Sequence, residues 1–483
     1  MSTPKEQEHV IDTEASTSGS SLSLDAKAER RVVRKCDIYL IPSLFVLYMM
    51  SFLDRINLGN ARIQNLEVDL DMTGFDYNVA LLTFFIGYIT LEAPSNILLR
   101  KMAPSTWLST LVFCWGVVVI GQGLTRSFAG LVVCRILLGV FEAGFLPGCF
   151  YLISMYYRRH EVQLRASAFF ASGMFAGAFG GLLAFALAKM DGVGGIFIVE
   201  GLITVVLGVL GKFFVADWPE SARFLNAEEK AVLLRRLEED KLVGQKEKID
   251  KATIILALRD WKIWTSAVIY IFLAAPGYGL SYFIPTILRE LGYTAAQAQV
   301  HSIPIYMAGV PLAILAAWAT ARFEQRFGVA LFGAAMCATG FAILLAQRRR
   351  ADAVPVGAKY AALFFIIDAT YICIPVNVLW LANNLAGPYK RAIGVGVMIG
   401  VGNLGGILGS LMFIPSEAPT YVTGYSIGLA GLVLIAVLDC VLYFGMRAEN
   451  RKRERGERDY RLRQPAEVVE CLGDDHPEFR YTL

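Results

Sequence analysis

The sequence predicts an all-α polytopic membrane protein with twelve transmembrane helices in two six-helix halves. Hydrophobic residues make up 55% of the 483 residues and the mean hydropathy is +0.51, well above the values of soluble globular proteins. Twelve windows of about 20 mostly apolar residues are each long enough to cross a bilayer. A polar stretch from Asp217 to Lys262 divides them into two sets of six that are about equally long, as expected after duplication of a six-helix unit.

The predicted spans follow one another with short polar connections. In the half formed by residues 36–217 they cover residues 38–58, 77–98, 106–124, 129–152, 164–188 and 196–216. In the half formed by residues 263–447 they cover residues 263–288, 299–321, 328–347, 357–382, 392–414 and 422–446.

Three polar segments lie outside the two halves. The first 29 residues are rich in Ser, Thr and Glu and have no apolar region, so we expect no cleavable signal peptide and a disordered tail over residues 1–35. In the linker, residues 218–262, the stretch NAEEKAVLLRRLEEDK has Leu and charges at helical spacing and predicts a solvated surface helix. Residues 448–483 are expected to form a second tail.

Lys and Arg in the short loops predict the orientation, because loops rich in these residues stay in the cytoplasm. Basic residues precede the first span and follow the second, fourth, eighth and tenth spans, which places both termini of this multi-pass protein in the cytoplasm. We expect the protein in the plasma membrane, although the sequence does not distinguish this membrane from that of an organelle. One loop disagrees with this orientation: QRRRAD, Gln347 to Asp352, has three arginines on the predicted outer side. We keep the orientation because the other loops agree with it.

Composition and motifs exclude several functions. The net charge of +3 is too small to indicate a nucleic-acid partner. The eight cysteines include no CxxC pair and the four histidines are dispersed, so no metal site or disulfide framework is expected. HEXXH, GXSXG and Walker-type glycine motifs do not occur, so we expect no enzyme and no cofactor.

Two of the predicted spans contain most of the charges that lie inside the membrane. FLDRINLGNAR in the first span places Asp54 beside Arg55, about 100° apart around a helix. CRILLGVFEAGFLPG in the fourth span separates Arg135 from Glu142 by two helical turns, about 10 Å on one face. Charges facing lipid would cost at least a few kcal/mol each, so this face is expected to look into the protein.

These residue types fit a site for an anion and a proton. Arginine binds a carboxylate bidentately and stays charged when it is desolvated. The proton occupancy of a buried carboxylate depends on whether a neighbouring arginine is engaged elsewhere, which couples anion binding to protonation. The alternative is a set of internal salt bridges that fixes helix packing, and for Asp54 with Arg55 the two interpretations stay open.

Longer stretches of the chain resemble the major facilitator superfamily, and within it the fungal branch of the anion:cation symporter family that includes allantoate, nicotinate, biotin and pantothenate permeases. The resemblance covers about residues 36–447. The stretches that support it are FLDRINLGNARI, GYITLEAPSNILLRKMAPSTWL, CRILLGVFEAGFLPG, YYRRHEVQLRASAFF, DWPESARFLNAEEKAVLLRRL and GNLGG.

The resemblance implies alternating access around a central cavity and symport of a small organic anion with protons by a chain that acts as a monomer in the lipid bilayer. It implies anion binding by Arg55 and Arg135 and proton coupling by Asp54 and Glu142. Cavity positions of the family match Tyr88, Trp380 and Asn403, although packing is an equally good interpretation of the last two.

The chain also departs from the family patterns. Leu99 stands near the Asp that the loop after the second span usually contains, and Phe52 stands where many relatives have Tyr. The main alternative is a proton-antiport exporter of a drug or secondary metabolite. Such exporters share a GXXXGPXXGG motif in the fifth span, which reads GMFAGAFGG from Gly173 to Gly181, with Ala178 in place of the Pro, so uptake is favoured.

Overall fold

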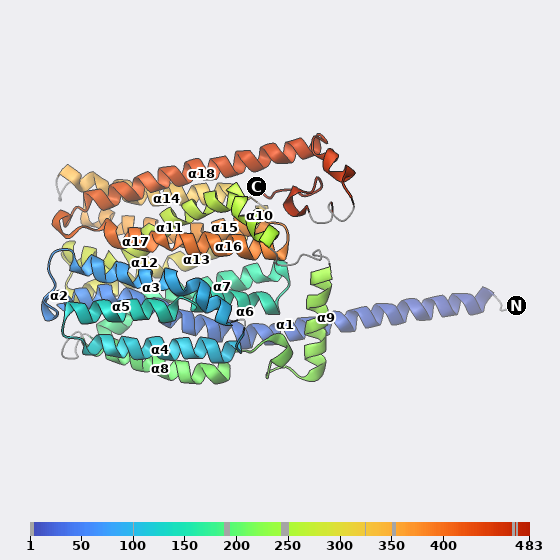
Figure 1. Cartoon of the computed structure of the whole chain (residues 1–483), viewed down its shortest axis with the longest axis horizontal. Coiled ribbons are helices and arrows are strands. Elements are labelled where there is room, and N and C mark those ends of the chain that lie inside the picture. The colour runs from blue at the N-terminus through green and yellow to red at the C-terminus, as the bar shows by residue number, and fades with distance from the viewer. Residues whose placement is uncertain are drawn as a thin grey trace.

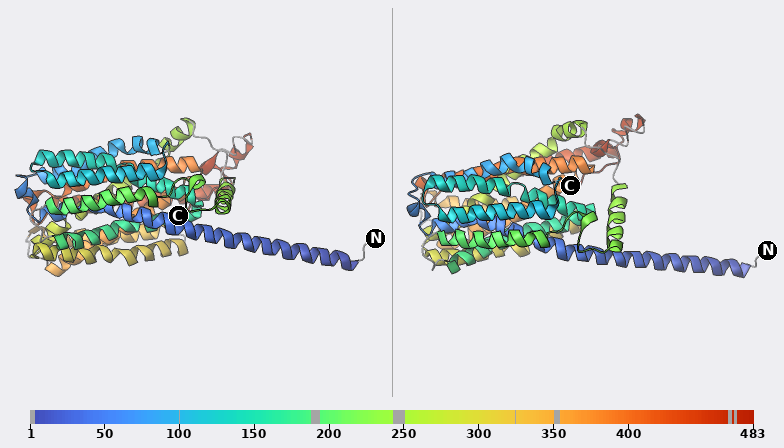
Figure 2. Two further views of the ribbon diagram at one scale, coloured as in Figure 1. Left: turned by 90° about the horizontal axis from the view of Figure 1, so that it is seen from below. Right: turned by 60° about the horizontal axis from the view of Figure 1, so that its bottom comes forward.

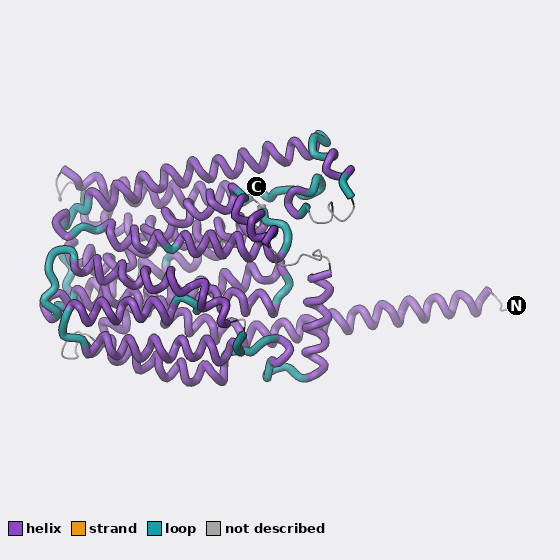
Figure 3. Tube along the Cα trace, viewed as in Figure 1, coloured by secondary structure: helices purple, strands orange, loops and turns teal. Residues whose placement is uncertain are grey.

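In the computed structural model the chain folds into an elongated bundle of helices (Figure 1). The structure describes residues 4–99, 101–187, 194–242, 251–323, 325–349, 354–465, 469 and 472–483. Within these residues every regular element is a helix, and Figure 3 shows helices joined by short loops. The predicted all-α membrane class is therefore confirmed.

The helices of the first half match its six predicted spans. Their bounds are α1 Pro4–Arg62, α2 Leu66–Asp69, α3 Asp76–Leu99, α4 Pro104–Leu124, α5 Phe128–Glu142, α6 Phe145–Tyr156, α7 Arg159–Leu187 and α8 Gly194–Phe214. α5 and α6 together form one apolar span. α1 begins at Pro4 and so includes most of the predicted N-terminal tail. The disorder of this tail and the division of the chain into two halves, a linker and two tails stay predictions.

The linker and the second half follow the same pattern. Their bounds are α9 Ala227–Leu242, α10 Lys251–Arg259, α11 Trp261–Glu290, α12 Ala295–Met307, α13 Gly309–Phe323, α14 Phe327–Leu345, α15 Val356–Asn383, α16 Pro388–Gly402, α17 Leu404–Met412 and α18 Val422–Glu454. α12 with α13 and α16 with α17 each form one span. Among the described residues eleven helices are long and apolar enough to cross a membrane, and α3 occupies the remaining predicted span, which is consistent with twelve.

The bundle has two distinct ends, which we name after helices. The α2 end carries α2, and the α9 end carries α9, α10 and both chain termini (Figure 1). α9 lies across its end and is tied to α1 by an ion pair of 2.7 Å between Lys35 Nζ and Glu229 Oε2. The basic loop that disagreed with the predicted orientation begins in a short 3-10 helix, Ala346–Arg349, and its residues 350–352 lie outside the described residues.

Capping residues explain where several helices begin. Ser127 Oγ accepts a hydrogen bond from the Gly130 amide at the start of α5, and Asp260 accepts one from the Lys262 amide at the start of α11. Thr294 and Gln297 form a reciprocal capping box at the start of α12. These side chains satisfy amide groups that have no partner within the helix, and so fix the ends of the spans.

Close helix packing joins the two halves along α1–α11, α3–α17 and α7–α12. Beyond this packed region the N-terminal part of α1, in blue, projects from the α9 end in both views of Figure 2. A Cβ atom on Gly59 of α1 would lie 2.3 Å from the Tyr282 carbonyl oxygen of α11. On α7, a Cβ atom on Gly177 would lie 2.5 Å from the Tyr306 ring, and one on Gly181 would lie 2.6 Å from the Gln299 carbonyl oxygen. The glycines of the GMFAGAFGG stretch thus allow close approach of α7 and α12, as small residues do in membrane helices.

At the α2 end, hydrogen bonds also cross between the halves. Asn78 Nδ2 of α3 donates to the carbonyl oxygens of Ser410 at 2.6 Å and Phe413 at 3.0 Å. Arg289 Nη1 of α11 donates to the Ile63 carbonyl oxygen at 2.9 Å. The α2 end is therefore held together by polar contacts as well as by packing.

Candidate functional site

An ion pair between α1 and α5 lies in the interior of the first half. Arg55 Nε donates to Glu142 Oε2 at 2.6 Å, and neither side chain is more than 2% exposed. Ser51 Oγ, one turn before Arg55, donates to the same carboxylate oxygen at 2.8 Å and accepts from Arg55 Nη2 at 3.3 Å. Arg55 and Glu142, two of the candidate residues, are therefore in direct contact, and Ser51 is a participant that the sequence analysis missed.

Aromatic rings surround the Arg55 guanidinium. Its Cζ atom lies 4.9 Å from the ring centres of Phe84 and Tyr88 on α3. Such cation–π contacts are worth up to about 2 kcal/mol when they are desolvated. Tyr278 of α11 lies within electrostatic range of Arg55, so the second half contributes to the same surroundings. Tyr88, which the resemblance implies as a cavity residue, thus contacts Arg55, and its role in binding stays a prediction.

Arg135 is buried to the same degree but has a different environment. It is 1% exposed, and neither Nε nor Nη2 has a hydrogen-bond partner among the described residues. Glu142 and Asp54 lie within its electrostatic range, as does the Tyr282 hydroxyl from α11. Because a buried guanidinium with unsatisfied donors is unfavourable, this group is suited to a hydrogen-bond acceptor that carries negative charge.

Asp54 of α1 contacts α8. Its Oδ2 atom accepts a weak hydrogen bond of 3.4 Å from Thr204 Oγ1, and its Oδ1 atom has no partner among the described residues. One turn before Thr204 stands Glu200, which is fully buried and also has no hydrogen-bond partner there for either carboxyl oxygen. The sequence analysis missed Glu200, although a single Glu in the apolar run GGIFIVEGLITVV was a usable signal.

Asn403 of the second half forms a hydrogen bond to Glu92 of the first half. It lies between α16 and α17, and its Nδ2 atom donates to Glu92 Oε2 of α3 at 3.2 Å. Glu92 stands one helical turn after Tyr88, within electrostatic range of Arg55. The structure thus places Asn403 next to the other candidate residues through Glu92.

Trp380 belongs to a different place, at the α9 end. Its Nε1 atom donates to the Thr482 carbonyl oxygen at 3.0 Å, and its ring lies 6.4 Å from that of Phe327. Asn384, one turn later on α15, donates to the same carbonyl at 2.9 Å. The described contacts of Trp380 are therefore made with the end of the chain, whereas Arg55 and Arg135 lie among α1, α3 and α5.

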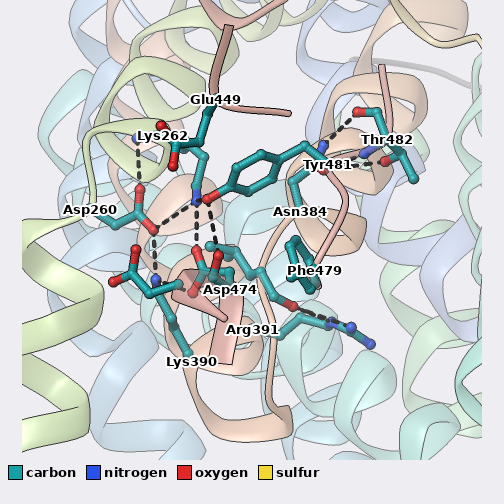
Figure 4. Close-up of polar contacts among 12 residues, drawn as sticks. Asp260, Lys262, Asn384, Lys390, Arg391, Glu449, Asp474, Phe479, Tyr481 and Thr482 are labelled. Atoms are coloured by element: carbon teal, nitrogen blue, oxygen red, sulfur yellow. Dashed lines mark hydrogen bonds and ion pairs between the residues drawn. The ribbon is translucent and has the colours of Figure 1, made fainter. Parts of the chain in front are cut away.

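The segment of residues 472–483 docks onto this end of the second half (Figure 4). Asp474 accepts from Lys262 Nζ at 2.6 Å and from Lys390 Nζ at 2.7 Å. Lys390 also pairs with Asp260 at 2.7 Å. We call these four residues the α9-end cluster. Burial raises the pKa of the Asp474 carboxyl, but Lys262 and Lys390 lower it more strongly, so this pKa lies below its ordinary value of 3.8.

Further contacts hold the same segment in place. Arg453 of α18 donates to the carbonyl oxygens of Phe479 and Asp474, both at 2.8 Å, and the Thr482 amide donates to Asn384 Oδ1 at 2.8 Å. The Tyr481 hydroxyl lies 3.1 Å from Lys262 Nζ. α11, α15, α16 and α18 are thereby joined through residues 472–483.

Among the described residues, no group of three or more His, Cys, Asp or Glu side chains is arranged to hold a metal ion.

The described helices that could cross a membrane, with ion-paired and unpaired charges buried among them, define a polytopic membrane protein with a polar interior. The family model described as Major Facilitator Superfamily matches residues 44–410. The chain therefore belongs to the Major Facilitator Superfamily, whose members are transporters and not enzymes.

Named relatives agree with this assignment. The chain is 34% identical over 457 residues to MFS transporter prlL of a fungal species, and the aligned region covers 90% of each chain. It is 31% identical over 459 residues to the high-affinity nicotinic acid transporter of Saccharomyces cerevisiae, which covers 94% of this chain and 85% of the relative. A bacterial homologue of the human lysosomal transporter Spinster shares the fold, with a TM-score of 0.61 at 14% identity over 85% of this chain and 96% of that one.

Proposed function

We propose that this protein is a proton-coupled symporter of a small organic anion, and that a carboxylate of the nicotinate kind is the first substrate to test. The observation that carries the proposal is the contrast between the two buried arginines. Arg55 is neutralised by Glu142 at 2.6 Å, whereas the Nε and Nη2 donors of Arg135 have no partner among the described residues. Arg135 is therefore the first contact for an incoming carboxylate.

Protonation of Glu142 would make the second arginine available. A neutral carboxyl attracts a guanidinium less strongly than a carboxylate does, so Arg55 could turn from Glu142 toward the bound anion. Ser51 would remain as a hydrogen-bond partner for the neutral acid, because its hydroxyl can both donate and accept. Binding of the proton at Glu142 and of the anion at both arginines would then favour each other, which is the requirement for symport.

The surroundings of this site suit a planar aromatic anion. The rings of Phe84 and Tyr88 already flank the Arg55 guanidinium at 4.9 Å, and Tyr278 faces it from the other half. A ring-bearing carboxylate could stack in the same place as it pairs with the arginines. The likeness to a relative named as a nicotinic acid transporter supports this choice.

Alternating access would follow from rocking of the two halves about the interface of α1–α11 and α7–α12. In the proposed cycle the site opens outward, takes up proton and anion, and releases both at the α9 end into the cytoplasm. Asp54 is a further candidate for proton binding. Asn403 would help to close the site through its hydrogen bond to Glu92. Trp380 would act at the exit, where it contacts the chain end. A monomer in the plasma membrane with cytoplasmic termini completes the proposal.

The test is uptake of radiolabelled nicotinate and a panel of other carboxylates by cells expressing the chain, at two external pH values. Accumulation that is faster at the lower pH supports symport, because a higher outside proton concentration drives the anion inward. The proton-antiport exporter predicts the opposite: preloaded label leaves the cells faster at the lower external pH. Label that moves equally in both directions and at both pH values would contradict proton coupling.

A further inference from the structure

We infer that Glu200 is a proton-binding residue of the transport site, and that it shares a proton with Asp54. This inference rests on the proposed proton coupling and adds to it a residue on α8. Glu200 is fully buried, and both of its carboxyl oxygens lack a hydrogen-bond partner among the described residues. An ionised carboxylate in such a place would be strongly disfavoured, whereas a neutral acid is tolerated.

Packing fixes Glu200 between α8, α4 and α1. Its neighbour Gly201 touches α4 so closely that a Cβ atom there would lie 2.7 Å from the Ile120 amide nitrogen and 2.8 Å from the Gly116 carbonyl oxygen. Thr204, one turn later, donates to Asp54 Oδ2 across the α1–α8 contact. Glu200 therefore cannot leave the interior without separation of α8 from α4.

The charged groups that face Glu200 are few. From α1 it interacts with Asp54, and from α5 with Arg135. α4 contributes no Asp, Glu, Lys, Arg or His, and the charged residues of α7 lie in its first seven residues, 159–165. Any change in the charge of Glu200 is thus felt first by Asp54 and Arg135, both of which belong to the candidate site.

A charge count shows why a proton is needed here. The acids within electrostatic range of Arg135 are Asp54, Glu142 and Glu200. With the guanidinium groups of Arg55 and Arg135 they form a buried cluster that would carry one excess negative charge if every member were ionised. Glu142 keeps its charge through Arg55 and Ser51. The proton that balances the cluster is therefore held by the remaining two acids, Asp54 and Glu200.

A bound monoanion would change this balance. It would bring one more negative charge to Arg135, and the cluster would bind one further proton to return to neutrality. The first proton would remain with Asp54 and Glu200 while Glu142 takes the second. Such a division would give the transporter one acid that pairs with an arginine and one acid pair that sets the charge of the site.

Infrared difference spectroscopy of the full-length protein in lipid nanodiscs tests the inference without any substrate, by following the C=O stretch of protonated carboxyls as pH is raised. The variants are Glu200→Gln, Asp54→Asn and, as a matched control, Asp439→Asn. Asp439 is also fully buried and both its oxygens lack partners among the described residues, but it stands on α18 in the second half. Glu200→Gln should remove one titrating band, and Asp54→Asn should move the pH midpoint of that band by about one pH unit or more.

Asp439→Asn should remove a different band and leave the midpoint of the Glu200 band unchanged. A Glu200→Gln spectrum with all wild-type carboxyl bands would overturn the inference, and so would an unmoved midpoint in Asp54→Asn. If Glu200→Gln does not fold, the comparison of Asp54→Asn with Asp439→Asn still decides, since coupled titration of Asp54 and Glu200 moves the midpoint of a second band in Asp54→Asn and leaves it unmoved in Asp439→Asn. Because no anion is present, failure of nicotinate uptake would count against the proposed function and leave this result standing.

Discussion

Arg55 and Glu142 form a hydrogen-bonded ion pair of 2.6 Å that leaves one carboxyl oxygen of Glu142 without a partner among the described residues. The pair joins α1 to α5 at the centre of the first half, and Arg135 lies two helical turns before Glu142 on the same helix. One positive charge is thus paired and the other is not, although both are equally buried. This asymmetry is the basis of the following predictions.

Replacing Glu142 by Gln should abolish accumulation of the anion against a gradient while leaving counterflow exchange in place. Gln has nearly the same shape but cannot exchange a proton, so the anion would move without coupling. Radiolabelled nicotinate uptake under a pH gradient and exchange in preloaded proteoliposomes measure the two activities. Glu290→Gln is the control, because this carboxyl accepts from the Tyr421 hydroxyl at 2.6 Å at the α2 end. Undiminished pH-driven accumulation in Glu142→Gln would exclude it as the coupling acid.

Replacing Arg135 by Gln should raise the half-saturation concentration for the anion by about 10- to 100-fold, since hydrogen bonds to a charged group contribute roughly 1.5–3 kcal/mol. The half-saturation concentration of Arg135→Lys should lie between those of wild type and Arg135→Gln, because Lys keeps the positive charge but loses the bidentate geometry. The dependence of initial uptake rate on nicotinate concentration provides the measurement. Arg322→Gln, at an exposed position of α13, should behave as wild type. Equal half-saturation in Arg135→Gln and wild type would remove this arginine from the site.

Replacing Gly59 by Ala should destabilise the observed packing of α1 against α11 by about 1–3 kcal/mol, as overpacking of a close contact does. The added Cβ would lie 2.3 Å from a backbone oxygen, which cannot move independently of α11. Melting of the purified protein in detergent, followed by tryptophan fluorescence, should occur several degrees below wild type. Gly121→Ala is the matched control, since a Cβ there meets nothing within 4 Å. A Gly59→Ala protein as stable as Gly121→Ala would show that the halves separate readily along α1.

Replacing Asp474 by Asn should release residues 472–483 from the α9-end cluster at neutral pH. The lowered pKa of Asp474 means that docking is stabilised above the ordinary value of 3.8 and is lost only as pH falls through the lower value. Cleavage by trypsin after the exposed Arg480, monitored by mass spectrometry at pH 8, should be faster in the variant. Asp475→Asn is the control, because Asp475 is half exposed and pairs with Arg461 at 3.0 Å. Similar cleavage rates in all three proteins would contradict a docking role for Asp474.

Much of the fold followed from hydropathy because a bilayer permits few backbone arrangements, and the predicted spans coincide with helices on this basis. That these charges lie inside the protein could be predicted, since charges facing lipid are costly, but the pairing of Arg55 with Glu142 depends on α1 lying against α5. The role of Glu200 could not be predicted because it is a single Glu in an apolar run and has no charged neighbour in the sequence. Its importance depends on α8 packing against α1, which is a tertiary relationship.

The position of Trp380 shows a different limit of sequence reasoning. A resemblance places it among cavity residues, but its indole donates to the Thr482 carbonyl, 102 residues later in the chain. No periodicity in residues 448–483 indicates that the segment returns to the bundle. The return depends on the buried lysines at positions 262 and 390, whose need for a negative partner becomes visible only when α11 and α16 are side by side.

The docked segment also has a consequence for synthesis of the protein. Lys262 and Lys390 enter the bundle long before the ribosome reaches Asp474, so until then Asp260 is the one described partner that both lysines can share. Arg453 likewise waits for the carbonyl oxygens of Asp474 and Phe479. The second half can therefore complete its α9 end only after residues 472–483 have left the ribosome, and a messenger RNA truncated before that point would yield a protein in which Lys262, Lys390 and Arg453 lack these partners.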